Sequence, residues 1–102
     1  MKRPLRESDI EKYLVKRVKE LGGECRKIQF IGRPGAPDRL VMLPIVWSDE
    51  LNRIADTTIW IELKAPGKKA EPHQAREHAR MRKMGQRVEV VDSFARVDEI
   101  LS

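Results

Sequence analysis

The stretch Thr-Ile-Trp-Ile-Glu-Leu-Lys-Ala, at residues 58–65, constrains the fold more than any other part of the chain. Its β-branched and aromatic residues predict a strand, and its strongly apolar character favours a central place in a sheet. Side chains of a strand alternate between two faces, so Glu62 and Lys64 share one face. The other face is aliphatic and carries Ile59, Ile61 and Leu63. Charged groups on a buried strand are costly unless something uses them, although an ion pair on an edge strand is the alternative.

The remaining pattern predicts one α/β domain over residues 1–102, with a mixed β-sheet flanked by helices in the order α-β-β-β-α-β-α. Ser8 followed by Glu11 has the spacing of a capping box that opens the first helix. Residues 44–57 are expected to be irregular or partly helical. The expected elements are a helix at 9–22, strands at 24–31, 38–43 and 58–65, a helix at 71–84, a strand at 88–91, and a short helix that ends at 101 and is capped by Asp92 or Ser93.

Composition indicates the setting and the kind of partner. Lysine and arginine number 21 against 16 acidic residues, and the net charge of +5 favours a polyanionic partner. A single cysteine, Cys25, excludes an intrachain disulfide and fits a reducing, cytosolic environment, where we expect a buried structural thiol. No apolar run approaches the length of about 18 residues that a membrane span needs, so no membrane association is expected.

Asp38 follows a turn rich in glycine and proline and opens the second predicted strand. A turn aspartate after proline is the simple interpretation. Together with Glu62, however, it would place two carboxylates at the ends of adjacent strands, with the Leu63 carbonyl as a third oxygen. Such hard oxygens suit Mg²⁺, which lowers the pKa of water and thereby promotes hydrolysis of a phosphodiester. Lys64 would orient that water or stabilise charge on the phosphate.

These residues resemble a known signature. Gly-Ala-Pro-Asp at 35–38, Glu62-x-Lys64, and Gln74 ten residues later are similar to the PD-(D/E)-x-K nucleases, and more closely to the VRR-NUC (virus-type replication-repair nuclease) family. The similarity covers almost the whole chain. It implies a restriction-endonuclease-like fold and cleavage of DNA with Mg²⁺ or Mn²⁺. Stand-alone members of this size look like phage proteins and resemble dimeric Holliday-junction resolvases. The resemblance therefore implies a homodimer that acts on branched DNA in the cytoplasm of a bacterial host.

The resemblance also assigns roles to two further residues. Glu11 matches a glutamate of the first helix that supports the metal site, with Glu7 as its substitute, whereas helix capping alone would also explain Glu11. Gln74 matches a glutamine that positions water or a phosphate, and exposure to solvent is the alternative.

Basic residues surround the predicted site, and each of them could also belong to an ordinary solvated surface. The candidates for DNA binding are Arg33, Arg39, Lys68 and Lys69. His73 and His78 lack the spacing of a helical zinc pair, and both are expected to be exposed.

The sequence thus predicts a metal-dependent, structure-selective DNA endonuclease. A nuclease of flaps, single strands or duplexes, and a catalytically silent DNA-binding module, remain alternatives. Trp47 could simply cap the core. Otherwise it belongs to the apolar residues of the irregular segment that are candidates for a dimer interface: Ile45, Val46, Trp47 and Leu51.

Overall fold

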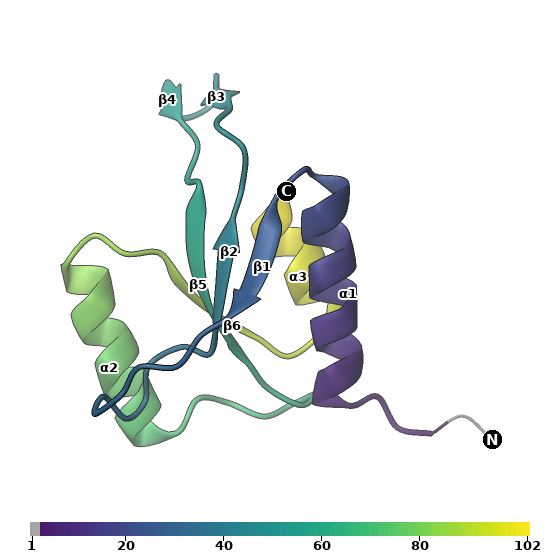
Figure 1. The fold of residues 1–102 in the computed structure, drawn as a ribbon, viewed down its shortest axis with the longest axis vertical. Helices are drawn as coiled ribbons and strands as arrows, with labels where there is room; N and C mark the ends of the chain where they lie inside the picture. Colours follow the sequence, from purple (N-terminus) through teal and green to yellow (C-terminus); the bar gives the residue numbers. More distant parts are fainter. Residues whose placement is uncertain (1–2) are drawn as a thin grey trace.

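The computed structural model describes residues 3–102 (Figure 1). It has the three helices α1 (Glu7–Glu20), α2 (Pro72–Lys83) and α3 (Phe94–Leu101). The main sheet contains β1 (Glu24–Lys27), β2 (Arg39–Met42), β5 (Thr58–Leu63) and β6 (Val88–Val91). A separate two-stranded hairpin contains β3 (Trp47–Ser48) and β4 (Arg53–Ile54). Within residues 3–102, none of the helices is long and apolar enough to cross a membrane.

The main sheet is mixed, with the spatial order β1-β2-β5-β6. β2 is antiparallel to both of its neighbours, whereas β5 and β6 are parallel. β5 lies inside the sheet, which confirms the central place expected for it. In the register, Ile61 lies opposite Arg39 of β2 and Glu89 of β6.

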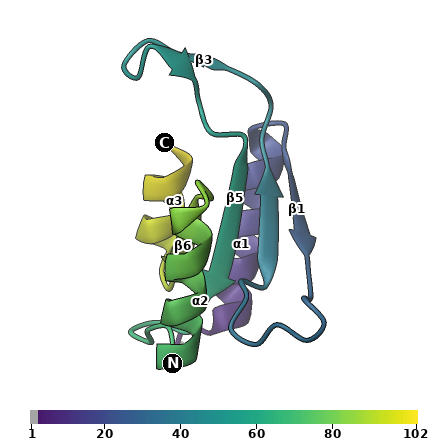
Figure 2. The same cartoon turned by 90° about the vertical axis from the view of Figure 1, so that its left-hand side faces the viewer.

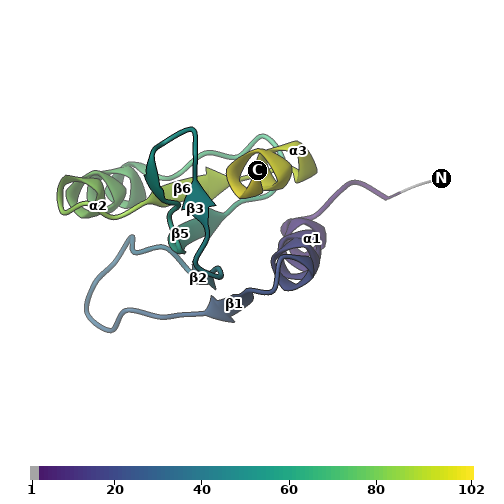
Figure 3. The ribbon, with the colours of Figure 1, turned by 90° about the horizontal axis from the view of Figure 1, so that it is seen from above.

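The helices lie on opposite sides of this sheet, α1 and α3 together on one side and α2 on the other (Figure 3). The first side is closed by a core in which the aliphatic face of β5 packs against the buried stripe of α1. This cluster includes Ile10, Leu14, Val18, Ile59, Ile61 and Leu63. Burial of these side chains provides the main driving force for folding and fixes which face of β5 is turned toward α2.

Residues 44–57 do not form the irregular or partly helical segment that we expected. The chain instead extends beyond β2 and β5 as an arm whose tip is the β3–β4 hairpin (Figures 1 and 2). Asn52 makes the turn possible with a φ of 53°, a left-handed conformation that asparagine tolerates better than most residues.

The strand predicted at 24–31 ends at Lys27, four residues early. Ile28 still donates its backbone N–H to the Asp38 carbonyl at 3.1 Å. The next residue of the opposing chain, Pro37, has no N–H to offer, so the ladder cannot continue.

The first helix begins two residues earlier than predicted. Arg6 is the N-cap, and its backbone N–H donates to the Asp9 carboxylate at 2.8 Å, while Arg3 pairs with that same carboxylate. The predicted capping box of Ser8 and Glu11 is therefore wrong, and the Glu11 side chain is free for another partner. At α3 the expected cap is present, because the Ser93 hydroxyl accepts from the Arg96 N–H at 3.0 Å.

Candidate active site

Asp38 is held against β5 by two hydrogen bonds to the main chain of that strand. Its N–H donates to the Ile61 carbonyl at 3.1 Å, and its Oδ1 accepts from the Leu63 N–H at 3.3 Å. The preceding turn requires glycine at position 35, where φ is +86° and a Cβ would lie 2.8 Å from the His73 carbonyl oxygen. The turn thus places Asp38 beside β5 and packs against the first turn of α2.

Glu62 lies on the face of β5 turned away from the aliphatic core, and only 5% of the residue is exposed. Its Oε1 is buried and has no hydrogen-bond partner among the described residues. Burial first, and then the neighbouring Asp38 carboxylate, raise the pKa of Glu62 to about 7. Burial likewise raises the pKa of Asp38. Two neighbouring carboxylates that resist ionisation provide the donor set that a divalent cation would stabilise.

Lys64 follows β5 and is half-buried. Its backbone N–H extends the pairing with β6 by donating to the Val91 carbonyl at 3.0 Å. Lys64 lies two residues after Glu62, and its positive charge partly offsets the raised pKa of both Asp38 and Glu62. The three residues that the sequence singled out therefore meet at one edge of the sheet. A direct role of the Leu63 carbonyl stays a prediction.

Two acids of α1 approach this site, and they differ in their surroundings. Glu11 forms a salt bridge with the buried Arg39, whose guanidinium also donates to the Asp38 carbonyl at 2.9 Å. Glu7 lies one helical turn earlier and lines a hollow of about 550 Å³ that Asp38 and Arg39 also line. The negative charge of Glu7 contributes to raising the pKa of Asp38 and of Glu62. Among residues 3–102, Glu7 has no ion pair and lines the hollow beside Asp38, so it suits the supporting role for which the sequence named it only as a substitute for Glu11.

The Gln74 side chain caps α2, since its Oε1 accepts from the Glu71 N–H at 2.8 Å. One turn later, His78 is 1% exposed and its Nε2 lies 3.8 Å from Glu62 Oε1. The expectation that His78 is exposed is therefore wrong. Positions 74, 78 and 81 share the helical stripe that packs on the sheet, which is why this imidazole is buried. His73 is exposed, as expected.

The four predicted DNA-binding residues differ in their exposure and in their ion pairs. Arg39 is only 7% exposed and is engaged by Glu11 and Asp38, so it does not suit a contact with DNA phosphates. Arg33 is half-exposed and makes a bidentate pair with Glu77, at 2.8 and 3.1 Å. Lys68 and Lys69 are exposed in the loop after β5 and remain candidates.

Cys25 is partly buried against the core. Burial, and next the charge of Asp38, raise the pKa of its thiol to about 11, which disfavours the reactive thiolate and fits the structural role expected for it.

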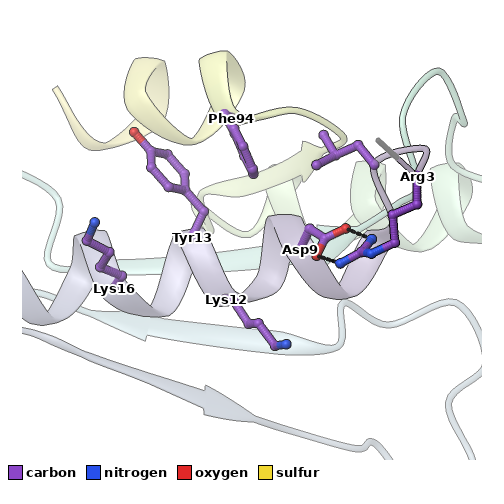
Figure 4. Close-up of a pocket in the computed structure, with 7 residues that line it drawn as sticks. Arg3, Asp9, Lys12, Tyr13, Lys16 and Phe94 are labelled. Atoms are coloured by element: carbon purple, nitrogen blue, oxygen red, sulfur yellow. Dashed lines mark hydrogen bonds and ion pairs between the residues drawn. The ribbon is translucent and has the colours of Figure 1, made fainter. Parts of the chain in front are cut away.

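A second hollow, of about 610 Å³, lies between α1 and the start of α3 (Figure 4). Tyr13 and Phe94 form part of its wall, with ring centroids 4.6 Å apart. Its one acid, Asp9, is paired with Arg3 through two hydrogen bonds of 2.6 and 2.7 Å (Figure 4). The one carboxylate among the described lining residues is therefore already paired, so this hollow offers no unpaired carboxylate to a cation.

Known proteins resemble the chain over nearly its full length. No family model matches it. A protein of Acyrthosiphon pisum secondary endosymbiont phage 1, described as "Putative nuclease p44", is 45% identical over 91 residues, which are 89% of this chain and 87% of the phage protein. A solved structure described as a VRR_NUC domain matches with a TM-score of 0.73 and 42% identity, covering 93% of this chain and 92% of the other. The mixed sheet, the flanking helices and these two relatives together place the chain in the VRR-NUC family of nucleases.

Proposed function

We propose that the protein is a divalent-metal-dependent DNA endonuclease that hydrolyses phosphodiester bonds. The observation that carries this proposal is the pair of Asp38 and Glu62, two neighbouring carboxylates with raised pKa values, one of which has a buried and unpaired oxygen. A cation between them would remove the penalty of ionising both.

Asp38 and Glu62, with the Leu63 carbonyl, would hold Mg²⁺ or Mn²⁺, and Glu7 or Glu11 would support it from α1. Among residues 3–102, no three His, Cys, Asp or Glu side chains converge closely enough to enclose a metal ion. Two carboxylates are nevertheless compatible with Mg²⁺, because this ion keeps several of its waters when few protein oxygens bind it.

When bound, the ion lowers the pKa of water and offsets negative charge on the scissile phosphate. Lys64 lies near both carboxylates, where its ammonium group orients the attacking water or stabilises the charge that develops on the phosphate. Gln74 would position water or a phosphate if its side chain gave up the hydrogen bond that it accepts from the Glu71 N–H. In-line attack that expels the 3′ oxygen would leave 5′-phosphate and 3′-hydroxyl ends.

We further propose branched DNA, especially a four-way junction, as the substrate, and a two-fold dimer as the active form. Two nicks on symmetry-related strands need two sites, and each chain provides one. The arm supplies suitable interface material, because its apolar side chains are at least half exposed: Ile45, Val46, Trp47 and Leu51. We also propose that this chain is a phage protein that acts on DNA in the cytoplasm of a bacterial host, and its similarity to a phage protein supports this proposal.

Cleavage of matched DNAs tests the activity and its selectivity. A labelled four-way junction, a flap, a single strand and a duplex, each incubated with Mg²⁺ or Mn²⁺, should show preferential nicking of the junction. Preference for another DNA would keep the nuclease and reject the resolvase. Absence of cleavage together with absence of Mn²⁺ binding in a calorimetric titration would indicate a silent DNA-binding module.

Light scattering at micromolar concentration tests the dimer. The expected mass is about twice the 11.8 kDa of one chain. Trp47→Ser should shift the mass toward the monomer without lowering the melting temperature of the domain body. A monomeric wild-type protein that nicks both strands of a junction in one binding event would contradict the symmetric arrangement.

A further inference from the structure

Only two buried side-chain atoms among the described residues lack a hydrogen-bond partner, Glu62 Oε1 and His78 Nε2. They face each other at 3.8 Å. Buried polar atoms in native proteins are nearly always paired, so two such exceptions side by side call for a physical explanation. Their separation exceeds a normal hydrogen bond by about 1 Å.

At 3.8 Å the two groups are too far apart for a hydrogen bond, so neither buried atom is satisfied by the other in this arrangement. An imidazole that carries a hydrogen on Nε2 is a donor, and the Glu62 carboxylate is an acceptor, so the two groups are chemically complementary. An apolar side chain would fill the same place under α2 without leaving an unpaired atom, which makes the imidazole a poor choice for packing alone.

The helix that carries His78 is tied to the turn that carries Asp38. Arg33, in that turn, makes its bidentate pair with Glu77, the residue before His78. Gly35 packs against the backbone of α2 at its first turn. The turn that carries Asp38 and the helix that carries His78 are therefore held together. This keeps both residues in fixed positions relative to Glu62, as a fixed orientation of its carboxylate requires.

We propose that His78 is a positioning residue: its Nε2–H donates to Oε1 of Glu62 and so turns the other carboxylate oxygen, Oε2, toward Asp38 and a divalent cation. The inference rests on the proposed function, because Glu62 is assigned there as a metal ligand. Groups that orient a metal-binding side chain in this way raise metal affinity without touching the ion. Gln74, one turn earlier on α2, faces the same side and leaves the contact with Oε1 to His78.

Titration of the purified, metal-free protein with Mn²⁺, followed by calorimetry, tests this role without reference to cleavage. His78→Leu keeps the volume and removes the donor. His78→Gln places an amide N–H near the position of the imidazole Nε2, whereas the amide of His78→Asn is too short to reach it. His73→Leu changes an exposed histidine of the same helix and serves as the matched control. Thermal unfolding in EDTA measures the stability of each variant.

Mn²⁺ affinity should fall by about 10–100-fold in His78→Leu and His78→Asn, and stay within about threefold of wild type in His78→Gln and His73→Leu. The melting temperature of His78→Leu in EDTA should equal or exceed that of wild type, because the unpaired nitrogen is gone. Should His78→Leu not fold, the Gln and Asn variants decide, and equal affinities in those two would overturn the inference. Unchanged affinity in His78→Leu would overturn it as well. A wild-type protein that binds no Mn²⁺ would instead reject the proposed function on which the inference rests.

Discussion

The two faces of β5 are built from alternating residues of one strand and have opposite characters. Toward α1 and α3, Ile59 and Ile61 are fully buried and Leu63 is 1% exposed, in a continuous aliphatic core. Toward α2, Glu62 is nearly as buried but has an unpaired oxygen and a raised pKa. Burial thus stabilises the fold on the aliphatic face, whereas on the polar face the same burial makes ionisation of the Glu62 carboxyl unfavourable.

The difference between the two faces indicates that one strand serves stability on its aliphatic face and function on its polar face. The aliphatic face fixes the position of β5, and the polar face uses that rigidity to hold groups that would otherwise move apart or become solvated. If this division is correct, substitutions on the two faces should affect different measurements.

Glu62→Gln should give the largest effect on activity. The substitution keeps the shape of the side chain and removes a charge that would hold the cation. Cleavage with Mg²⁺ should fall by at least about 10³-fold, since loss of a metal ligand removes several kcal/mol of stabilisation from the reaction. The metal-free protein should be as stable as wild type or more so. Single-turnover nicking measures the first quantity, and urea unfolding in EDTA measures the second.

Ile61→Ala is the matched change on the other face, one residue away. Loss of a fully buried aliphatic side chain should lower the free energy of unfolding by about 2–5 kcal/mol. The fraction that stays folded should retain its affinity for Mn²⁺. For the comparison with the polar face, Glu62→Gln is the decisive variant. If it kept more than about a tenth of the wild-type activity, the assignment of function to the polar face would be wrong.

Lys64→Ala should have a smaller and different effect. Metal affinity should stay the same or rise, because a positive charge near both carboxylates is removed. Turnover should fall by about 10²–10³-fold, the size expected for one electrostatic or proton-transfer group. Mn²⁺ titration and single-turnover rates separate these outcomes, and parallel losses in both would assign Lys64 to metal binding instead.

Much of this contrast was visible in the sequence, because it follows from strand periodicity. The apolar run at 58–65 identified β5, and alternation assigned Glu62 to the face opposite Ile61. Contacts between distant segments were not visible. The pair of Arg39 with Glu11 joins residues 28 apart, and that of Arg33 with Glu77 joins residues 44 apart.

Local competition explains the error at the start of α1. Ser8 with Glu11 and Arg6 with Asp9 have the same spacing, and the second pair forms the cap, with Arg3 as a further partner of Asp9. The metal ligands, the DNA-binding lysines and the dimer stay predictions, since each depends on a partner that binds the chain from outside.

The pH dependence of stability provides the next test of the polar face. The pKa of Glu62 rises from 4.5 to about 7 on folding, so the folded protein binds a proton more tightly than the unfolded chain. As pH increases through this window, Glu62 should destabilise the metal-free protein by up to about 3 kcal/mol, whereas below it the group has no effect. Urea unfolding in EDTA at pH 5 and pH 8 should therefore show a larger loss for wild type than for Glu62→Gln. Equal losses in the two proteins would show that Glu62 ionises freely in the fold.

Glu7 and Glu11 should give the smallest effects and extend the contrast to α1. Glu11→Gln weakens the partner of the buried Arg39 and should lower the free energy of unfolding by about 1–3 kcal/mol. Glu7→Gln changes an exposed side chain and should alter stability by less than about 0.5 kcal/mol. Because the Glu7 carboxylate faces the hollow beside Asp38, its loss should nevertheless lower Mn²⁺ affinity and cleavage. The reverse result, with metal affinity lost only in Glu11→Gln, would show that Glu11 leaves Arg39 to serve the metal when the site is loaded.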